Sequence, residues 1–248
     1  MLKTPFPTPP ADWWHPTPGL TWQWQIGDNN IDTSIAADVF DIDLYVEQAV
    51  IDELHARGRK VIGYISVGSW ENWRPDADQF SPEVLGKDYE GWPGERWLDI
   101  RRLDLLAPIM QRRLDLCAQK GFDAVEPDNM EIYNNATGFP LTYADQLGYV
   151  RWLSEQAHGR GMAIGMKNAA DMVADALELF DFAILEDYYY YGWCDQMLPF
   201  IAQGKPVFAA EYTDMQVDFE AACAYGRAHQ FSFILKNRGL DVFRKACA

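Results

Sequence analysis

The sequence predicts a single-domain (β/α)₈ barrel, and three observations favour that fold class. Strand-like and helix-like segments alternate from about residue 20 to the end of the chain, which is typical of parallel α/β folds. Eight strand-like segments can be counted, and 248 residues is an ordinary length for such a barrel. No glycine-rich phosphate fingerprint follows the first strand, which counts against the competing fold, a doubly wound open sheet.

The chain begins with a proline-rich arm, for which we take residues 1–19. It holds six prolines together with Trp13, Trp14 and His15, and it has no helix or strand period. We therefore expect an extended arm or linker, with residues 20–248 forming the barrel domain. Met1 is followed by this arm rather than by the apolar region of a signal peptide. That pattern indicates either a cytoplasmic protein or a trimmed chain.

Eight short apolar segments bounded by turn residues are the strand candidates. In chain order they are residues 21–26, 37–42, 60–67, 122–125, 163–167, 182–185, 206–210 and 231–235. The fourth should stop at Pro127, because a proline cannot donate to a sheet ladder. The long insertion 69–99, rich in Trp, Pro and Gly, is expected to be a loop over the mouth of the barrel.

Helical patterns fill the intervals between the strand candidates. They cover residues 44–57, 102–120, 142–158, 171–179, 195–203, 218–228 and 240–246. The second carries apolar residues along one face at spacings of three and four, namely Leu103, Leu106, Met110, Leu114 and Cys117. The third opens with a capping pair, Thr142 and Asp145, and ends at Gly159.

The composition narrows the classes of ligand. With 21 Lys and Arg against 37 Asp and Glu, the net charge of −16 argues against nucleic acid or anionic lipid as partner. It suits a neutral or cationic ligand, although solubility alone would also explain it. No apolar run approaches the ~20 residues that span a membrane. Ten Trp and twelve Tyr suit stacking against sugars, although many rings must belong to the core.

Polar residues follow nearly every predicted strand, where a parallel barrel builds its active site. These residues are Gln25, Asp41, Asp43, Ser66, Ser69, Glu126, Asp128, Lys167, Asn168, Glu186, Glu211, Tyr212, Lys236 and Asn237. A solvated rim would also be polar, but it need not place carboxylates directly after apolar strands. We therefore interpret this end of the barrel as the functional face.

A pair of carboxylates at this face suits cleavage of a glycosidic bond. Asp128 and Glu186 close the fourth and sixth strands, and these strand ends should lie near each other across a small barrel. Glu126 shares a face with Asp128 one layer deeper, as a supporting acid. Hydrogen bonds to sugar hydroxyls are expected from Asn129, Tyr133 and Asn168. Stacking on sugars is expected from Trp70, Trp73, Trp92 and the run Tyr188–Tyr191.

Other functions remain open at this point. Lys167 or Lys236 could form a Schiff base, as in an aldolase or lyase, and a non-catalytic carbohydrate-binding barrel would have the same face. The four histidines are scattered, so we expect no metal and no cofactor. Cys117 falls on a helical apolar stripe and is expected to be a buried thiol. Cys194 and Cys223 could form one disulfide if the protein is secreted.

Several ordered segments resemble glycoside hydrolase family 114. They are Thr21-Trp-Gln-Trp-Gln25, Asp38-Val-Phe-Asp-Ile-Asp43, Gly63-Tyr-Ile-Ser-Val-Gly-Ser-Trp-Glu71, Trp73-Arg-Pro-Asp-Ala77, Trp97-Leu-Asp-Ile-Arg101, Gly121-Phe-Asp-Ala-Val-Glu-Pro-Asp-Asn129, Lys167-Asn168, Glu186 and Glu211-Tyr212. The resemblance covers roughly residues 20–237.

The resemblance implies a secreted, retaining endo-α-1,4-polygalactosaminidase on a (β/α)₈ barrel. Asp128 would be the nucleophile and Glu186 the acid/base, acting on a cationic amino-sugar polymer. The sugar would contact Asp41, Asp43, Glu211 and the other polar strand-end residues. A hydrolase of another α-linked polysaccharide remains the alternative. We expect a monomer.

Three departures from the family pattern lie near the expected site. This chain reads Glu186-Asp-Tyr188 and Ile62-Gly-Tyr64 where the family has a cysteine in each segment. If those two cysteines pair in relatives, Cys194–Cys223 is the bridge left for this chain. Met130-Glu-Ile-Tyr133 also differs from the family's usual Val-Asp-Gly-Tyr, and no role is assigned to Glu131.

Overall fold

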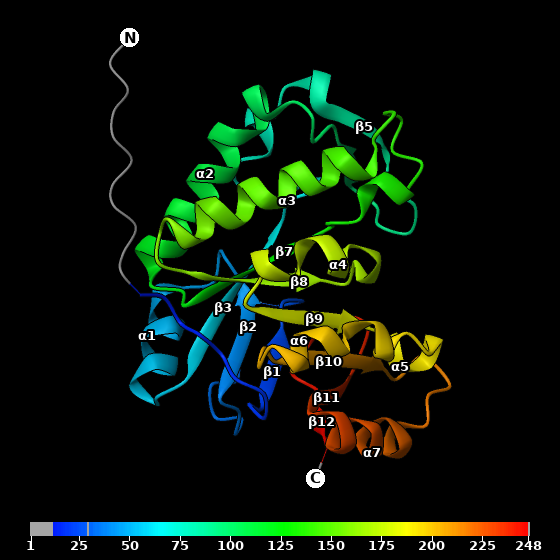
Figure 1. Ribbon diagram of the computed structural model, residues 1–248. Helices are drawn as coiled ribbons and strands as arrows, with labels where there is room; N and C mark the ends of the chain where they lie inside the picture. The colour runs from blue at the N-terminus through cyan, green and yellow to red at the C-terminus, as the bar shows by residue number, and fades with distance from the viewer. Residues whose placement is uncertain (1–11, 29, 248) are drawn as a thin grey trace.

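The computed structural model describes residues 12–28 and 30–247, and its centre is a curled sheet of eight parallel strands (Figure 1). The strands are β1 (Trp22–Gln25), β2 (Val39–Asp43), β3 (Lys60–Ser66), β7 (Ala124–Asp128), β8 (Ala163–Lys167), β9 (Phe182–Glu186), β10 (Val207–Tyr212) and β11 (Phe231–Lys236), neighbouring one another in that order. All eight predicted strands and the predicted (β/α)₈ architecture are confirmed.

Side chains join the first and last strands of the barrel. The indole Nε1 of Trp22 donates to the carbonyl of Ser232 at 2.8 Å. The hydroxyl of Ser232 in turn donates to the carbonyl of Leu20 at 2.7 Å. A short strand, β12 (Lys245–Ala246), pairs antiparallel with β11. The sheet therefore closes on itself, and the carboxyl ends of its parallel strands gather at one rim.

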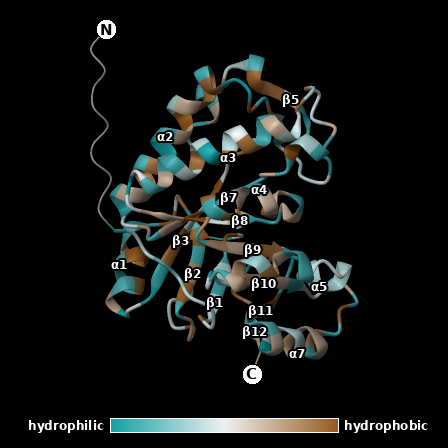
Figure 2. Cartoon of the chain, in the orientation of Figure 1, coloured by the Kyte–Doolittle hydropathy of each residue, from teal (hydrophilic) through white to brown (hydrophobic). Residues whose placement is uncertain are grey.

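Helices surround the barrel, with α2 and α3 lying side by side on one flank (Figure 1). The α-helices are α1 (Gln48–Ala56), α2 (Leu103–Lys120), α3 (Tyr143–His158), α4 (Val173–Ala176), α5 (Tyr188–Tyr191), α6 (Leu198–Ala202) and α7 (Phe219–His229). Short 3₁₀ turns occur at η1 (Ala77–Gln79), η2 (Pro82–Val84), η3 (Ile132–Asn134), η4 (Ala170–Met172), η5 (Leu177–Leu179) and η6 (Cys194–Met197). Hydrophobic residues are frequent on the central strands and hydrophilic residues on the helices (Figure 2).

Two apolar clusters hold the layers together. One fills the barrel interior and includes Trp22, Trp24, Phe182 and Phe208. The other lies between the sheet and the helices and includes the stripe residues Leu106, Met110, Leu114 and Cys117 of α2. The amphipathic pattern of α2 thus packs against the sheet as predicted, and Cys117 is a buried free thiol.

The sequence signals for helix ends are confirmed at α3 and α2. The amide of Thr142 donates to Asp145 Oδ2 at 2.8 Å, and the amide of Asp145 donates to the Thr142 hydroxyl at 3.2 Å. This reciprocal capping box satisfies two amides at the start of the helix. At the end of α2, Gly121 adopts φ 85°, the left-handed conformation that glycine takes without steric cost.

Two segment predictions were wrong. The fourth strand does not stop before Pro127, because pairing with β3 continues through Ile65–Pro127 to Ser66–Asp128. Pairing with β8 ends earlier, at Val125. The predicted helix 240–246 does not form. Instead, Lys236 Nζ donates a hydrogen bond to the carbonyl of Asp241 at 2.7 Å, and β12 pairs with β11.

The insertion after β3 is a small sheet rather than a bare loop. Its strands are β4 (Ser69–Glu71), β5 (Leu85–Asp88) and β6 (Glu95–Leu98), paired antiparallel in the order β4-β6-β5. The Trp, Pro and Gly content of this stretch hid its short strands in the sequence. The insertion does lie over the mouth of the barrel, because several of its residues line the pocket described below.

The predicted arm is partly visible, since residues 1–11 lie outside the described residues. Trp13 stacks on His158 with ring centroids 4.2 Å apart, and its Nε1 donates to Asp181 Oδ1 at 3.0 Å. Trp14 contacts Phe182 at the start of β9. Residues 12–19 contain no helix or strand, and Trp13 and Trp14 pack at the end of the barrel opposite the strand carboxyl ends.

The disulfide joins Cys223 of α7 to Cys247, with Cα atoms 5.3 Å apart. The expected bridge between Cys194 and Cys223 is therefore wrong, and Cys194 is a buried free thiol. Pairing of β12 with β11 brings the end of the chain back to α7, which the sequence spacing did not reveal. None of the described helices has the length and apolarity needed to cross a membrane.

Candidate active site

A pocket of about 730 Å³ opens at the carboxyl ends of the strands. Its floor is formed by Asp128, Lys167 and Glu186, the last residues of β7, β8 and β9. Its walls come from the insertion, from residues 129–135 and from residues 238–240. The structure thus brings together the two acids that strand counting selected.

Lys167 lies at the centre of the floor and contacts three carboxylates. Its Nζ is 2.9 Å from Asp128 Oδ1, 2.9 Å from Glu186 Oε2 and 3.3 Å from Glu126 Oε1. The ammonium also lies 5.0 Å from the centre of the Trp24 ring. Burial lowers the pKa of Lys167, but Asp128, Glu186 and Glu126 together raise it well above its usual value. The lysine is therefore a fixed positive charge.

Asp128 is held as an ionised carboxylate. Its Oδ2 accepts from the Tyr64 hydroxyl at 2.9 Å, while its Oδ1 faces Lys167. Burial raises the pKa of Asp128, but Lys167 and these hydrogen bonds outweigh burial and leave the pKa below its usual value. Its side chain keeps 22% exposure, whereas Glu126 one layer deeper has none. Asp128 is thus the acid of this strand that a ligand can reach.

Glu186 faces Asp128 across Lys167. Its Oε1 accepts from the Tyr212 hydroxyl, and its amide donates to Asn168 Oδ1 at 3.0 Å. The ring of Tyr212 is covered by Arg238, 3.6 Å from the ring centre. The Glu186 side chain is 27% exposed, so its carboxyl is both oriented by the protein and open to the pocket.

A second pair of carboxyls, Asp41 and Glu126, is fully buried beneath the floor. Burial and then the charge of Glu126 raise the pKa of Asp41 well above its usual value. Burial also raises the pKa of Glu126, to about 7, while Lys167 opposes that change. Trp24 Nε1 donates to Glu126 Oε2 at 3.1 Å. Glu126 thus contacts Lys167 from beneath the floor, and neither acid lines the pocket.

The chain turns sharply after each of the three floor strands. Asn129, Asn168, Ala169 and Asp187 all have left-handed backbone conformations, with φ between 52° and 63°. Such conformations are uncommon for residues other than glycine and cluster at functional sites. Ala169 is the costliest of the four, and its amide is held by Glu131 Oε2 at 3.0 Å. Glu131, for which the sequence suggested no role, stabilises the turn after Lys167.

The insertion provides a charged and aromatic wall. Arg74 bridges Asp43, at 2.5 Å, and Glu71, at 2.7 Å. Trp73 and Trp92 also line the pocket, and each is about half exposed, at 53% and 51%. Large aromatic faces left open beside a polar floor are typical of sugar-binding pockets.

The predicted substrate-binding residues divide into two groups. Asp43, Trp73, Asn129, Lys167 and Asn168 line the pocket. The others do not line it, namely Gln25, Asp41, Ser69, Glu126, Tyr133, Tyr188, Glu211, Tyr212 and Lys236. Several of these support residues that do line it: Ser69 contacts Asn129 at 3.2 Å, and Tyr212 contacts Glu186.

Strand parity explains why Glu211 lies outside the pocket. Its neighbours Ala210 and Tyr212 face the barrel interior, so Glu211 faces outwards. There it accepts from the amides of Tyr189 and Tyr190 at 2.8 and 3.2 Å and holds the start of α5. Burial raises the pKa of Glu211 to about 7.

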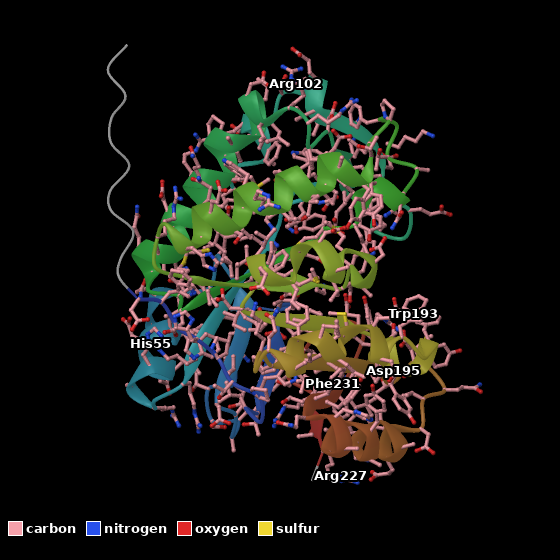
Figure 3. All side chains as sticks on the ribbon, viewed as in Figure 1. His55, Arg102, Trp193, Asp195, Arg227 and Phe231 are labelled. Carbon is pink, nitrogen blue, oxygen red and sulfur yellow. A yellow bond between two sulfur atoms is a disulfide. The ribbon has the colours of Figure 1, made fainter. Side chains whose placement is uncertain are left out.

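The remaining outlying residues are held by local contacts. Gln25 donates to the carbonyl of Asn30 at 2.9 Å, and Tyr133 donates to Asp171. Lys236 is buried, and burial lowers its pKa to about 8. Tyr188 is buried, whereas Tyr190 and Tyr191 of α5 are exposed, and none of the three lines the pocket. Trp193, which follows α5 (Figure 3), is also exposed outside the pocket lining.

Sequence reasoning missed Tyr64, Glu71, Arg74 and Glu95, which all line the pocket. The position of Tyr64 could have been predicted from the sequence. It stands two residues after Ile62, which faces the barrel interior, and side chains two apart on a strand point to the same side. The other three belong to or follow the strands of the insertion, where no strand period was recognised. Among the described residues, no group of three His, Cys, Asp or Glu side chains is placed to hold a metal ion.

Two carboxyls that face each other across a fixed ammonium can act as nucleophile and proton donor toward a bond placed between them. The comparisons with known proteins agree with that chemistry. The model of glycoside-hydrolase family GH114 matches residues 3–248. The crystal structure of Aspergillus fumigatus Ega3 in complex with galactosamine is 38% identical and superposes with a TM-score of 0.90, covering 97% of this chain and 100% of that one.

Two further matches are more distant. The glycoside hydrolase domain of PelA from Pseudomonas aeruginosa is 12% identical with a TM-score of 0.71, covering 92% of this chain and 98% of that domain. At that identity the likeness shows the fold alone. An uncharacterised protein of Deinococcus radiodurans is 26% identical, over 90% of this chain and 80% of its own.

Proposed function

This chain belongs to glycoside hydrolase family GH114, and from that premise we propose that it is a retaining endo-hydrolase of α-1,4-linked, galactosamine-containing polysaccharide. The observation that carries the proposal is the floor of the pocket. There Asp128 and Glu186 each lie 2.9 Å from Lys167 Nζ with their carboxyls open to the pocket. Among the described residues, these are the only two pocket-lining acids that pair with the same lysine.

The first step forms a covalent intermediate. A carboxylate oxygen of Asp128 attacks the anomeric carbon while the bond from that carbon to the leaving oxygen breaks. The leaving oxygen takes the bonding electron pair together with a proton from Glu186. Tyr64 and Lys167 keep Asp128 ionised, as the step requires.

The second step releases the sugar. Glu186, now a carboxylate, takes a proton from water as the water oxygen attacks the anomeric carbon and Asp128 leaves. Retention requires carboxyls about 5–5.5 Å apart. Because both acids contact the same ammonium at 2.9 Å, their facing oxygens lie within twice that distance. That spacing favours the retaining mechanism over the inverting one, which needs wider separation to admit a water.

The substrate class is supported by charge and by likeness. A polymer with free amines is cationic, and a chain of net charge −16 attracts it. The similar Aspergillus fumigatus structure holds galactosamine. The aldolase alternative is disfavoured, because a Schiff base needs a neutral amine and the acidic neighbours of Lys167, Asp128 first, raise its pKa well above the usual value. Hydrolysis of another α-linked polysaccharide remains the alternative substrate.

We propose that the protein works outside the cytoplasm as a monomer, without metal or cofactor, with residues 20–248 as its catalytic domain. The disulfide between Cys223 and Cys247 supports an oxidising compartment.

Incubation with galactosaminogalactan, in de-N-acetylated and acetylated forms, tests the activity. We expect oligosaccharides from the de-N-acetylated polymer, with newly formed reducing ends initially in the α configuration by proton NMR. β reducing ends would overturn the retaining mechanism, and absence of oligosaccharides from both polymers would overturn the substrate.

The residue assignment is tested by Asp128→Asn and Glu186→Gln. Each change keeps the shape of the side chain and removes a group that takes part in bond making, so kcat should fall by at least about 1000-fold. Asp115→Asn is the matched control, because Asp115 is a half-exposed residue of α2 that pairs with Arg160 outside the pocket; this change should leave kcat unchanged. Normal cleavage by either active-site variant would contradict the assignment.

A further inference from the structure

Glu95 differs from the other acids of the pocket. It is the first residue of β6 in the insertion, lines the pocket and is only 8% exposed. Its Oε2 accepts from the Ser69 hydroxyl at 2.5 Å. Its other oxygen has no hydrogen-bond or ion-pair partner among the residues that the structure describes. A nearly buried carboxylate is thus directed into the pocket with half of its acceptor capacity unused.

The other pocket acids are neutralised or engaged. Asp43 and Glu71 are paired with Arg74, and Asp128 and Glu186 with Lys167. Glu131 accepts from the amide of Ala169, and Asp28 is exposed at the rim. No cationic side chain pairs with Glu95 in the described part of the chain. Burial raises the pKa of Glu95 to about 7, and the charges of Glu71 and Asp128 add to that rise.

The surroundings of Glu95 fit an amino sugar. The amide of Tyr89 donates to the carbonyl of Glu95; the Tyr89 ring lies 3.9 Å from the buried Trp97 ring and 6.4 Å from Trp92, which is half exposed, and all three line the pocket. A sugar ring packs its C–H face on such rings. Side-chain contacts also lead from Glu95 through Ser69 and Asn129 to Asp128. Glu95 therefore belongs to the same cleft as the nucleophile.

We propose that Glu95 binds the ammonium group of a 2-amino-2-deoxyhexose unit and so selects the de-N-acetylated form of the polymer. A carboxyl without a cationic partner in a poorly solvated wall gains most from a cation that the ligand supplies. An N-acetylated unit brings a neutral amide to the same place and offers no charge. The inference rests on the proposed function, because it names the form of the substrate that the site accepts.

Glu95→Gln tests the inference on both forms of the polymer. The variant keeps the size of the side chain and an oxygen that accepts from Ser69, but it loses the charge. We expect kcat/KM on the de-N-acetylated polymer to fall at least about 10-fold, mainly through KM, with the acetylated polymer cleaved as by the wild type. Glu90→Gln, the same change at an exposed position of the same insertion, should change neither rate. Equal losses on both polymers, or no loss on either, would overturn the inference.

Binding of monosaccharides separates this inference from the proposed function. Calorimetric titration should show that wild-type protein binds galactosamine at least about 10-fold more tightly than N-acetylgalactosamine, and that Glu95→Gln removes the preference. If wild-type protein cleaves neither polymer, the proposed function fails while this titration still decides the role of Glu95. If the variant does not fold, the wild-type titration alone is decisive, because absence of a preference for galactosamine contradicts an ammonium site.

Discussion

At the scale of single residues, Lys167 sets the charge balance of the site. One ammonium that is 3% exposed contacts Glu126, Asp128 and Glu186, which lie on the two strands flanking its own. Buried carboxylates this close together would otherwise hold protons. Lys167 is therefore the reason why Asp128 is ionised although it lies in a low-dielectric floor. Burial and the charge of Glu126 raise the pKa of Asp41, the fourth acid in this part of the barrel interior, well above its usual value.

Replacing Lys167 by Met should shift the pH dependence of the enzyme. Without the ammonium, burial dominates and the pKa of Asp128 rises. Because Asp128, the proposed nucleophile, must be ionised to react, the acidic limb of the kcat/KM profile should move to higher pH, and activity at neutral pH should fall by at least about 100-fold. A pH–rate profile measures both effects. An unshifted acidic limb would show that Lys167 does not control Asp128.

A matched control for that change is Lys120→Met. Lys120 is half-buried and donates to the backbone carbonyls of Leu44 and Val46, but it lies outside the pocket lining. Its replacement should lower stability without moving the acidic limb. The comparison separates the loss of a lysine as such from the loss of the charge beside Asp128.

At the scale of elements, close packing joins the insertion to the floor strands. Gly68 lies between β3 and β4, and a Cβ atom there would stand 2.0 Å from the carbonyl oxygen of Asn129. Only glycine lets the two segments approach so closely. The position of the insertion wall, with Arg74 and Glu95, therefore depends on a contact between backbones that no side-chain pattern reveals.

Two glycine-to-alanine changes should have opposite effects on stability. Gly68→Ala forces the turn after β7 away from β3, so we expect the unfolding free energy to fall by about 1–3 kcal/mol and kcat/KM to fall as Asn129 moves. Gly148→Ala lies within α3, where an added Cβ meets nothing within 4 Å, so the unfolding free energy should rise by up to about 1 kcal/mol. Denaturant unfolding measures both. A stabilised Gly68→Ala protein would contradict the close approach of the two segments.

At the scale of the whole molecule, the chain ends are fixed to the barrel. Trp13 and Trp14 pack at one end of the barrel, and the Cys223–Cys247 disulfide ties the last residues to α7. The bridge closes a loop of chain between two cysteines that are 24 residues apart in the sequence. Such a cross-link stabilises a protein mainly by restricting the unfolded chain. These contacts lie away from the pocket, so they affect stability rather than chemistry.

Cys247→Ser should therefore lower the unfolding free energy by about 2–4 kcal/mol under oxidising conditions and leave kcat/KM at room temperature unchanged. Thermal unfolding with and without reductant measures the effect, because reduction should bring the wild type close to the variant. Equal stability of the two proteins under oxidising conditions would show that the bridge contributes nothing.

Sequence alone determined the order of strands and, through it, the two acids that we propose as the catalytic pair, Asp128 and Glu186, which both line the pocket. Apolar segments and their periods depend on local chemistry, and Asp128 and Glu186 follow from counting strands and reading their last residues. The same reading placed Glu126 one layer deeper, which the structure confirms. The capping box at Thr142 was equally local.

Only the tertiary structure decided which polar residues meet. Glu211 faces outwards by strand parity, Glu131 holds the turn at Ala169, and Cys223 pairs with Cys247 because β12 returns the chain to β11. Glu95 became visible only when the insertion folded over the floor. These outcomes depend on contacts between segments far apart in the chain, which hydrophobic period and turn chemistry do not encode.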